Sequence, residues 1–202
     1  MKDNKTIILI GPMCAGKSTV AELLAKKLAI PHYAVDDHRW DLYEQTDYSK
    51  EVAAQIMKSD QGTLGLLQYM KPFEVYAVER ILAEQSNCVI DFGAGHSVHE
   101  DPQLFARVEK AMAPFDNVIL LLPSEDVDQS VKILNERFEQ LLQREVGEVD
   151  PKLLGLNDHF TKHPSNFRLA KHIVYTDGKT AEETCDEIIE AVTFGQCPVQ
   201  SV

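Results

Sequence analysis

Short apolar runs alternate with amphipathic segments along this chain, and the alternation predicts strands and helices in turn. The apolar runs are four to six residues long, as buried strands are. Most of the segments between them carry apolar residues at every third or fourth position, which is the spacing of one helix face. We expect strands at residues 6–10, 32–35, 88–91, 117–122 and 172–176.

This order of elements predicts an α/β fold. Consecutive parallel strands need a crossover connection, and a helix is the usual one. Five such strands indicate a parallel sheet with helices on both faces, and right-handed crossovers leave few topologies. The chain has no internal repeat and no linker-like tract, so we expect one domain over residues 1–202.

Some helices are clearer than others. Residues 38–86 are mostly helical in pattern, and the clearest helices within them are 49–58 and 73–85. Asp101-Pro102 predicts a helix start, because Asp is a favoured N-cap and Pro a favoured first helical residue.

The first strand runs directly into Gly11-x-x-x-x-Gly16-Lys17-Ser18, the phosphate-binding loop or Walker A motif. Glycines let the backbone turn its N–H groups toward an anion, and the following helix adds the positive end of its dipole. Lys17 can reach the β- and γ-phosphates, and the Ser18 hydroxyl can bind Mg²⁺. The alternative is a glycine turn that binds nothing. The residues expected at the nucleotide are Gly11, Pro12, Met13, Cys14, Ala15, Gly16, Lys17, Ser18 and Thr19.

Two strands end in acids. Cys88-Val-Ile-Asp91 has the form of a Walker B strand, so we expect Asp91 to help Ser18 place Mg²⁺, although strands also end in Asp to cap a turn. Asp36 follows the second strand, where a carboxylate can accept the proton of a substrate hydroxyl or anchor the acceptor. Its alternative role, like that of Asp37, is to cap a helix.

Basic residues follow the fourth strand. Arg137 and Arg144 are two helical turns apart and share a face, so Arg137 is a candidate catalytic residue that offsets charge on the phosphates. Solvated charges on a helix face are the alternative. Residues 147–167 are basic and weakly periodic, and we expect a mobile lid over about residues 137–167.

The third strand leads into Gly93-Ala-Gly95, which either brings bare backbone next to a substrate or forms a plain turn. His96 and His99 follow and are expected to be loop residues. No metal-ligand spacing supports a zinc site at these two histidines, and the cysteines form no C-x-x-C pair and have no nearby histidine cluster at zinc spacing.

Composition excludes several classes. Against 20 Lys and Arg stand 32 Asp and Glu, and a net charge of −12 argues against a general nucleic-acid binder. No apolar run is long enough for a membrane span, and no signal peptide is apparent, so we expect a cytoplasmic protein. Its oligomeric state, monomer or homodimer, stays open. The cysteines are expected to be free thiols, with Cys14 either filling the loop or carrying a lowered pKa: Cys14, Cys88, Cys185 and Cys197.

The chain resembles the small P-loop kinases of the shikimate kinase, gluconate kinase and nucleoside-monophosphate kinase group over about residues 5–193. The resemblance rests on residues 11–19, Val35-Asp36, residues 90–95 and residues 173–180. It implies a three-layer P-loop NTPase fold with sheet order 2-3-1-4-5 and a lid. It also implies binding of ATP with Mg²⁺, and phosphorylation of a small acceptor held by the helical region at about 38–86.

The acceptor half departs from the shikimate kinase pattern. Of the D-x-D acids, Ala34-Val35-Asp36 keeps only the second. The F-R-x-x-E motif aligns with residues 75–79, which replaces the arginine that grips the acceptor carboxylate by Tyr76. With Trp40 and Glu79 nearby, this predicts a neutral or cationic acceptor, such as a nucleoside or an amino-alcohol, rather than shikimate.

A second class of function stays open: a regulatory nucleotide-binding NTPase, or switch, without a small-molecule acceptor. A GTPase switch would carry an N-K-x-D guanine motif on a late strand, and the sequence has none. The identity of the acceptor cannot be read from the residues.

Overall fold

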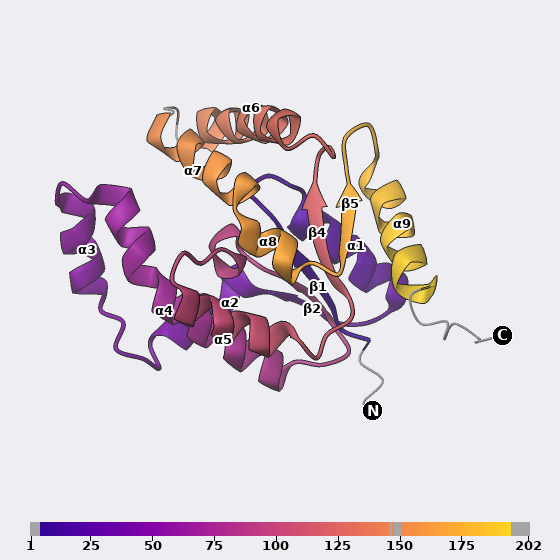
Figure 1. Ribbon diagram of the computed structural model, residues 1–202, viewed down its shortest axis with the longest axis horizontal. Coiled ribbons are helices and arrows are strands. Elements are labelled where there is room, and N and C mark those ends of the chain that lie inside the picture. The colour runs from indigo at the N-terminus through magenta and orange to yellow at the C-terminus, as the bar shows by residue number, and fades with distance from the viewer. Residues whose placement is uncertain (1–4, 146, 148–150, 195–202) are drawn as a thin grey trace.

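The computed structural model describes residues 5–145, 147 and 151–194. Its centre is a five-stranded parallel sheet of order β2-β3-β1-β4-β5, which confirms the predicted α/β architecture (Figure 1). The phosphate-loop strand β1 is central, between β3 and β4. The strands are β1 Ile7–Ile10, β2 His32–Ala34, β3 Val89–Asp91, β4 Val118–Leu122 and β5 His172–Tyr175.

Helices cover both faces of the sheet. Figure 1 shows α1 and α9 together on one face and α4, α5 and α8 on the other, with α6 and α7 side by side beyond the strand ends. None of the helices described here has both the length and the apolar character needed to cross a bilayer. The helices are α1 Lys17–Leu28, α2 Val35–Tyr43, α3 Lys50–Lys58, α4 Gly62–Glu84, the 3₁₀ helix η1 Ala94–Ser97, α5 Pro102–Met112, α6 Val127–Glu145, α7 Pro151–Lys162, α8 Pro164–Leu169 and α9 Ala181–Phe194.

The two faces have separate cores because side chains alternate along each strand. In β1, Ile8 and Ile10 pack with α4 and α5, whereas Ile7 and Leu9 pack with α1 and α9. A strand buried on both faces must be apolar throughout, which explains the unbroken apolar run at the start of the chain.

Four helices differ from the prediction. Helix α2 begins at Val35, which was expected to end the second strand, so Asp36 lies in the first turn of the helix. Helix α4 begins at Gly62 rather than near residue 73, with Pro72 inside it. Proline removes one helical hydrogen bond, but α4 continues through it because both of its halves bury apolar side chains in the core. The weakly periodic segment after residue 147 forms α7 and α8.

The predicted start of α5 is confirmed. The Asp101 carboxylate accepts hydrogen bonds from the N–H groups of Gln103 (2.7 Å) and Leu104 (3.2 Å), and Pro102 is the first helical residue. This cap fixes the end of the loop that starts at β3, and that loop forms one wall of the site described next.

Candidate functional site

The carboxyl ends of three strands bring the predicted residues to one edge of the sheet. Ala34, Asp91 and Leu9 lie in register across β2, β3 and β1, so the segments that follow them leave the sheet side by side. The phosphate loop follows β1 and ends at Gly16, which caps α1 with a φ of 91°. Gly11 is equally required, because an added Cβ would lie 2.6 Å from the Leu121 carbonyl oxygen.

Lys17 lies buried within the loop. Its ammonium group donates hydrogen bonds to the carbonyl oxygens of Gly11 (2.9 Å) and Pro12 (2.8 Å). Burial lowers the pKa of Lys17 to about 8, and the carboxylates of Asp36 and Asp91 oppose that shift. The ammonium group is therefore held at the loop by neutral carbonyl oxygens, and the anionic oxygens of a ligand would be stronger acceptors for it.

Asp91 links two other residues of the site. Ser18 Oγ donates to Asp91 Oδ2 at 2.7 Å, and His32 Nε2 lies 2.6 Å from Asp91 Oδ1. The predicted pair of Ser18 and Asp91 is thus brought together. Its hydroxyl and carboxylate oxygens are the hard ligands that Mg²⁺ prefers. His32 was not predicted, because a histidine that begins a strand carries no distinctive signal.

Asp36 projects from the first turn of α2 beside the turn that follows β3. An added Cβ at Gly93 would lie 2.6 Å from Asp36 Oδ1, so glycine is required for this approach. Arg39, one helical turn further on, pairs with Asp36 at 3.0 Å. The charge of Asp36 acts on Lys17 of the loop, and Arg39 is an unpredicted partner of the carboxylate.

A buried ion pair lies on the other side of this turn. Lys71 Nζ lies 2.9 Å from Glu74 Oε2, and both side chains are almost fully buried. The same ammonium donates to the carbonyl oxygens of Gly95 (2.9 Å) and Val98 (2.8 Å). A lysine ammonium has three donors, so each donor of Lys71 has a partner.

The expected acceptor residues of α4 lie elsewhere, which corrects the predicted register. Tyr76 donates to Gln45 (3.3 Å), and Glu79 pairs with Arg107 at the surface (2.6 Å). Lys71 and Glu74 are three residues apart, the spacing of R and E in F-R-x-x-E, and share a helix face. Tyr76 is two residues beyond Glu74, roughly 200° around the helix, and so faces away.

The two histidines after this turn are buried; His96 belongs to the 3₁₀ helix η1, whereas His99 lies in the loop after it, as expected. Tyr43 Oη lies 3.3 Å from His96 Nε2, while His96 Nδ1 has no partner within the described part of the chain. His99 Nε2 lies 3.1 Å from the His96 carbonyl oxygen, and burial lowers the pKa of His99 to about 4. His99 is therefore neutral at physiological pH.

Helix α7 is docked over the phosphate loop. The buried Asn157 accepts from the Met13 N–H (3.1 Å) and donates to the Met13 carbonyl oxygen (3.4 Å). Leu156 and Phe160 of α7 pack with Ala94 and Val98 on the segment after β3. Nothing in the sequence pattern predicted Asn157, since a lone buried asparagine looks like any polar helix residue.

The two arginines of α6 have different surroundings in the structure. Arg137 is half-buried, and its positive charge acts on Cys14 in the loop. Arg144 is exposed beside Glu145 and is therefore more open to solvent than Arg137.

Burial raises the pKa of the Cys14 thiol, so the lowered-pKa alternative for Cys14 is wrong. Cys14, Cys88 and Cys185 are free, and Cys197 lies outside the described residues.

Comparison with known proteins agrees with this geometry. The family model for shikimate kinase matches residues 13–193. A shikimate kinase from Aquifex aeolicus is 30% identical over 71% of this chain and 74% of its own, and one from Bacillus licheniformis is 24% identical over 96% of both.

Solved structures show the same fold. A shikimate kinase from Acinetobacter baumannii in complex with shikimate superposes with a TM-score of 0.65 at 17% identity, covering 98% of this chain and 97% of that one. A gluconokinase from Sinorhizobium meliloti gives 0.55 at 16% identity, covering 95% and 97%. Together with the phosphate loop and the sheet order, the family match shows that the chain belongs to the shikimate kinase family of P-loop kinases.

Proposed function

We propose that the protein transfers the γ-phosphoryl group of ATP to a hydroxyl of a small neutral or cationic acceptor, assisted by Mg²⁺, and that this acceptor is not shikimate. The complete phosphate loop and the family match support the nucleotide half of the proposal. The observation that carries the acceptor half is the state of Lys71, whose charge is already compensated by the buried Glu74 carboxylate and whose other two donors are engaged by backbone carbonyls.

The nucleotide would bind at the loop through the backbone N–H groups and Lys17. Lys17 would give up the Gly11 and Pro12 carbonyls for phosphate oxygens, which are stronger acceptors. Ser18 and Asp91 would hold Mg²⁺, which would neutralise charge on the phosphate oxygens when bound. Arg137 would add positive charge from α6, since it already lies within electrostatic reach of the loop.

Asp36 would act on the acceptor. Its carboxylate lies beside Gly93, close enough to Lys17 for the two charges to interact. It would accept the proton of the attacking hydroxyl or anchor that hydroxyl, while Arg39 holds the carboxylate in place. Arg39 limits how far Asp36 can turn and also compensates its charge.

The charged side chains described on the acceptor side are already paired with one another. Asp36 is matched by Arg39, and Glu74 by Lys71, so neither of these two cations is left to pair with an acceptor carboxylate. An ionised carboxylate bound here without a partner would cost several kcal/mol. This supports a neutral or cationic hydroxyl compound, with the half-exposed Trp40 indole available as an apolar surface.

The test is an ATP-consumption screen against nucleosides, amino-alcohols, neutral sugars, shikimate and gluconate. We expect turnover with a neutral or cationic acceptor. A kcat/KM of about 10⁴ M⁻¹s⁻¹ or more with shikimate or gluconate would contradict the acceptor proposal. A slow ATPase that no acceptor stimulates, with nucleotide-dependent binding of a partner, would instead favour the regulatory NTPase.

A Lys71→Arg variant tests the carrying observation itself. Arginine has five donors where lysine has three, so the variant can keep the three contacts and still offer donors to a carboxylate. We expect it to gain activity toward shikimate or gluconate relative to the parent. A Lys58→Arg variant in α3, an exposed lysine, is the matched control.

A further inference from the structure

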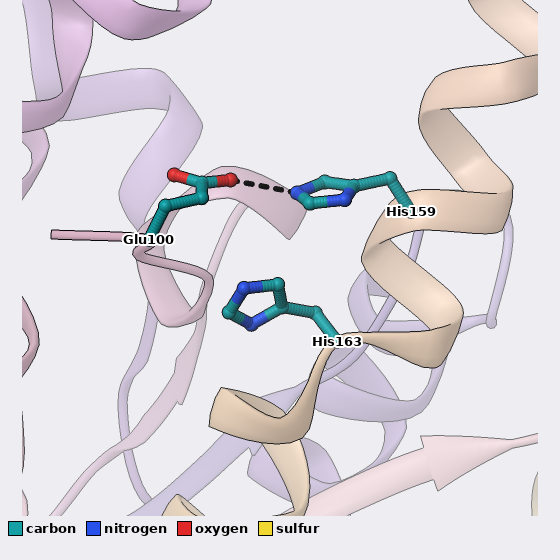
Figure 2. A group of neighbouring side chains, drawn as sticks. All are labelled: Glu100, His159 and His163. Carbon is teal, nitrogen blue, oxygen red and sulfur yellow. Dashed lines mark hydrogen bonds and ion pairs between the residues drawn. The ribbon is translucent and has the colours of Figure 1, made fainter.

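Three metal-ligating side chains meet away from the phosphate loop. Figure 2 shows Glu100, His159 and His163 pointing toward one another from different segments. Glu100 follows η1, His159 is on α7, and His163 caps α8. None of them has a part in the proposed phosphoryl transfer, so they need a separate explanation.

Their geometry approaches that of a coordination site. His159 Nε2 lies 2.7 Å from Glu100 Oε1, and one ligand atom from each of the three residues lies within 4.8 Å of the others. Tetrahedral ligands of Zn²⁺, bound at about 2.0–2.1 Å, are separated by roughly 3.3 Å. Small side-chain rotations therefore suffice to enclose an ion. His159 lies near the end of α7 and His163 at the cap of α8, and their ring centroids are 5.1 Å apart.

We propose that Glu100, His159 and His163 form a binding site for a divalent transition-metal ion of the zinc type, with water completing the coordination. Two imidazole nitrogens and one carboxylate oxygen form a borderline donor set that suits Zn²⁺ better than Mg²⁺ or Ca²⁺, which prefer oxygen alone. The site is independent of the proposed function, because it shares no ligand with the phosphate loop.

The surroundings allow an ion to enter. Glu100 and His163 line an open hollow of about 430 Å³, and Glu100 and His159 are exposed. The nearest buried cation, Lys71, is compensated by Glu74.

One existing bond opposes the ion and limits its affinity. His163 Nδ1 accepts the Ser165 N–H (3.2 Å) that caps α8. In Figure 2 the other ring nitrogen faces Glu100, and ligation through it moves the ring proton to Nδ1, which ends the cap bond. We therefore expect binding weaker than that of a four-ligand structural zinc, with a Kd of about 1–50 µM.

An ion here would fasten α7 to the core. Glu100 belongs to the segment after η1, whereas His159 lies two residues from Asn157, which bonds the phosphate loop. Coordination would thus hold α7 in its docked position and raise the thermal midpoint of the whole protein.

The experiment is isothermal titration of the metal-stripped full chain with Zn²⁺, with Co²⁺ as a visible probe of coordination. We expect one zinc per chain, visible Co²⁺ d–d bands, and a raised thermal midpoint. Glu100→Gln, His159→Ala and His163→Ala should each weaken zinc binding at least 10-fold. Because Glu100 is exposed and glutamine has nearly its size, this variant should fold even if a histidine variant does not.

Matched controls separate this site from the other zinc ligands of the chain. His172→Ala, on β5 outside the cluster, and a Cys14→Ser, Cys197→Ser double variant should bind zinc like the parent. The proposal is overturned if the parent binds no zinc at 100 µM, if Glu100→Gln binds as tightly as the parent, or if a control variant loses the ion.

Discussion

The side-chain amide of Asn157 hydrogen-bonds both backbone polar groups of Met13, a residue 144 positions earlier in the chain. One amide thus satisfies an N–H and a carbonyl inside the phosphate loop, and Asn157 is fully buried while doing so. The loop and α7 are therefore joined by hydrogen bonds, and a change in the position of one alters the hydrogen bonding of the other.

The first prediction concerns this contact and the proposed lid. Asn157→Ala leaves the Met13 groups without partners, which costs about 1–3 kcal/mol. We expect faster hydrogen exchange in α7 and weaker ATP binding. In the parent protein, a non-hydrolysable ATP analogue should slow exchange over residues 151–167.

Asn135→Ala is the matched control, because Asn135 joins α6 to α7 through Asp158 (2.6 Å) without contacting the loop. It should leave ATP affinity nearly unchanged. If exchange in α7 is already slow and the analogue does not alter it, the segment is not a lid.

The second prediction is a loss of activity at alkaline pH through Lys17, whose pKa is about 8. Above that pH the free protein loses the cation that faces the phosphates, so kcat/KM should fall about tenfold per pH unit. Lys17→Ala should bind ATP poorly at every pH. Lys17→Arg, if it retains measurable activity, should lose the decline, because a guanidinium stays charged.

The same shift has a defined sign for stability. Since the pKa of Lys17 falls from 10.5 when unfolded to about 8 when folded, unfolding takes up a proton between these values. The burial penalty is fully present below pH 8 and is relieved as pH rises to 10.5. Lys17→Met should therefore be more stable than the parent at pH 7, and the difference should shrink by pH 10.

The third prediction concerns Asp36. Asp36→Asn should slow phosphoryl transfer by roughly 10²–10⁴-fold while leaving ATP affinity nearly intact, the usual effect of removing a general base. Asp37→Asn, its exposed neighbour, should have little effect. Equal losses of ATP binding and turnover in Asp36→Asn, measured by titration and steady-state kinetics, would indicate a structural or metal role instead.

The fourth prediction compares two ion pairs on one helix. Glu74→Gln leaves Lys71 as a buried charge without its carboxylate, which should cost about 3–5 kcal/mol and lower the thermal midpoint by about 6–20 °C. Glu79→Gln breaks only the surface pair with Arg107, worth about 0–1 kcal/mol. Similar midpoints for the two variants in thermal unfolding would contradict this account of Lys71.

The nucleotide half of the site could be predicted because its chemistry is local in sequence. Nine consecutive residues form the loop, and the strand before it and the helix after it have their own periodicity. Asp91 was placed by the end of an apolar strand, and its contact with Ser18 followed from the parallel sheet.

The acceptor half depends on contacts between distant segments, which no local pattern specifies. In the sequence, Lys71 and Glu74 look like ordinary charged helix residues. Their role becomes visible only when the fold brings the Gly95 and Val98 carbonyl oxygens to Lys71. The spacing of Lys71 and Glu74, after the apolar Met70, was a signal that could have fixed the register of α4. The sequence contains no comparable signal for the burial of His96 or for the docking of Asn157 on the phosphate loop.

The central position of β1 has a consequence for biosynthesis. Its hydrogen-bonding neighbours β3 and β4 begin at Val89 and Val118, so β1 leaves the ribosome well before either partner strand has been made. At about 5–20 residues per second this delay is on the order of 4–16 s. During that time Ile7–Ile10, a run of four apolar residues, is exposed, and this is the segment that a nascent-chain chaperone would need to shield.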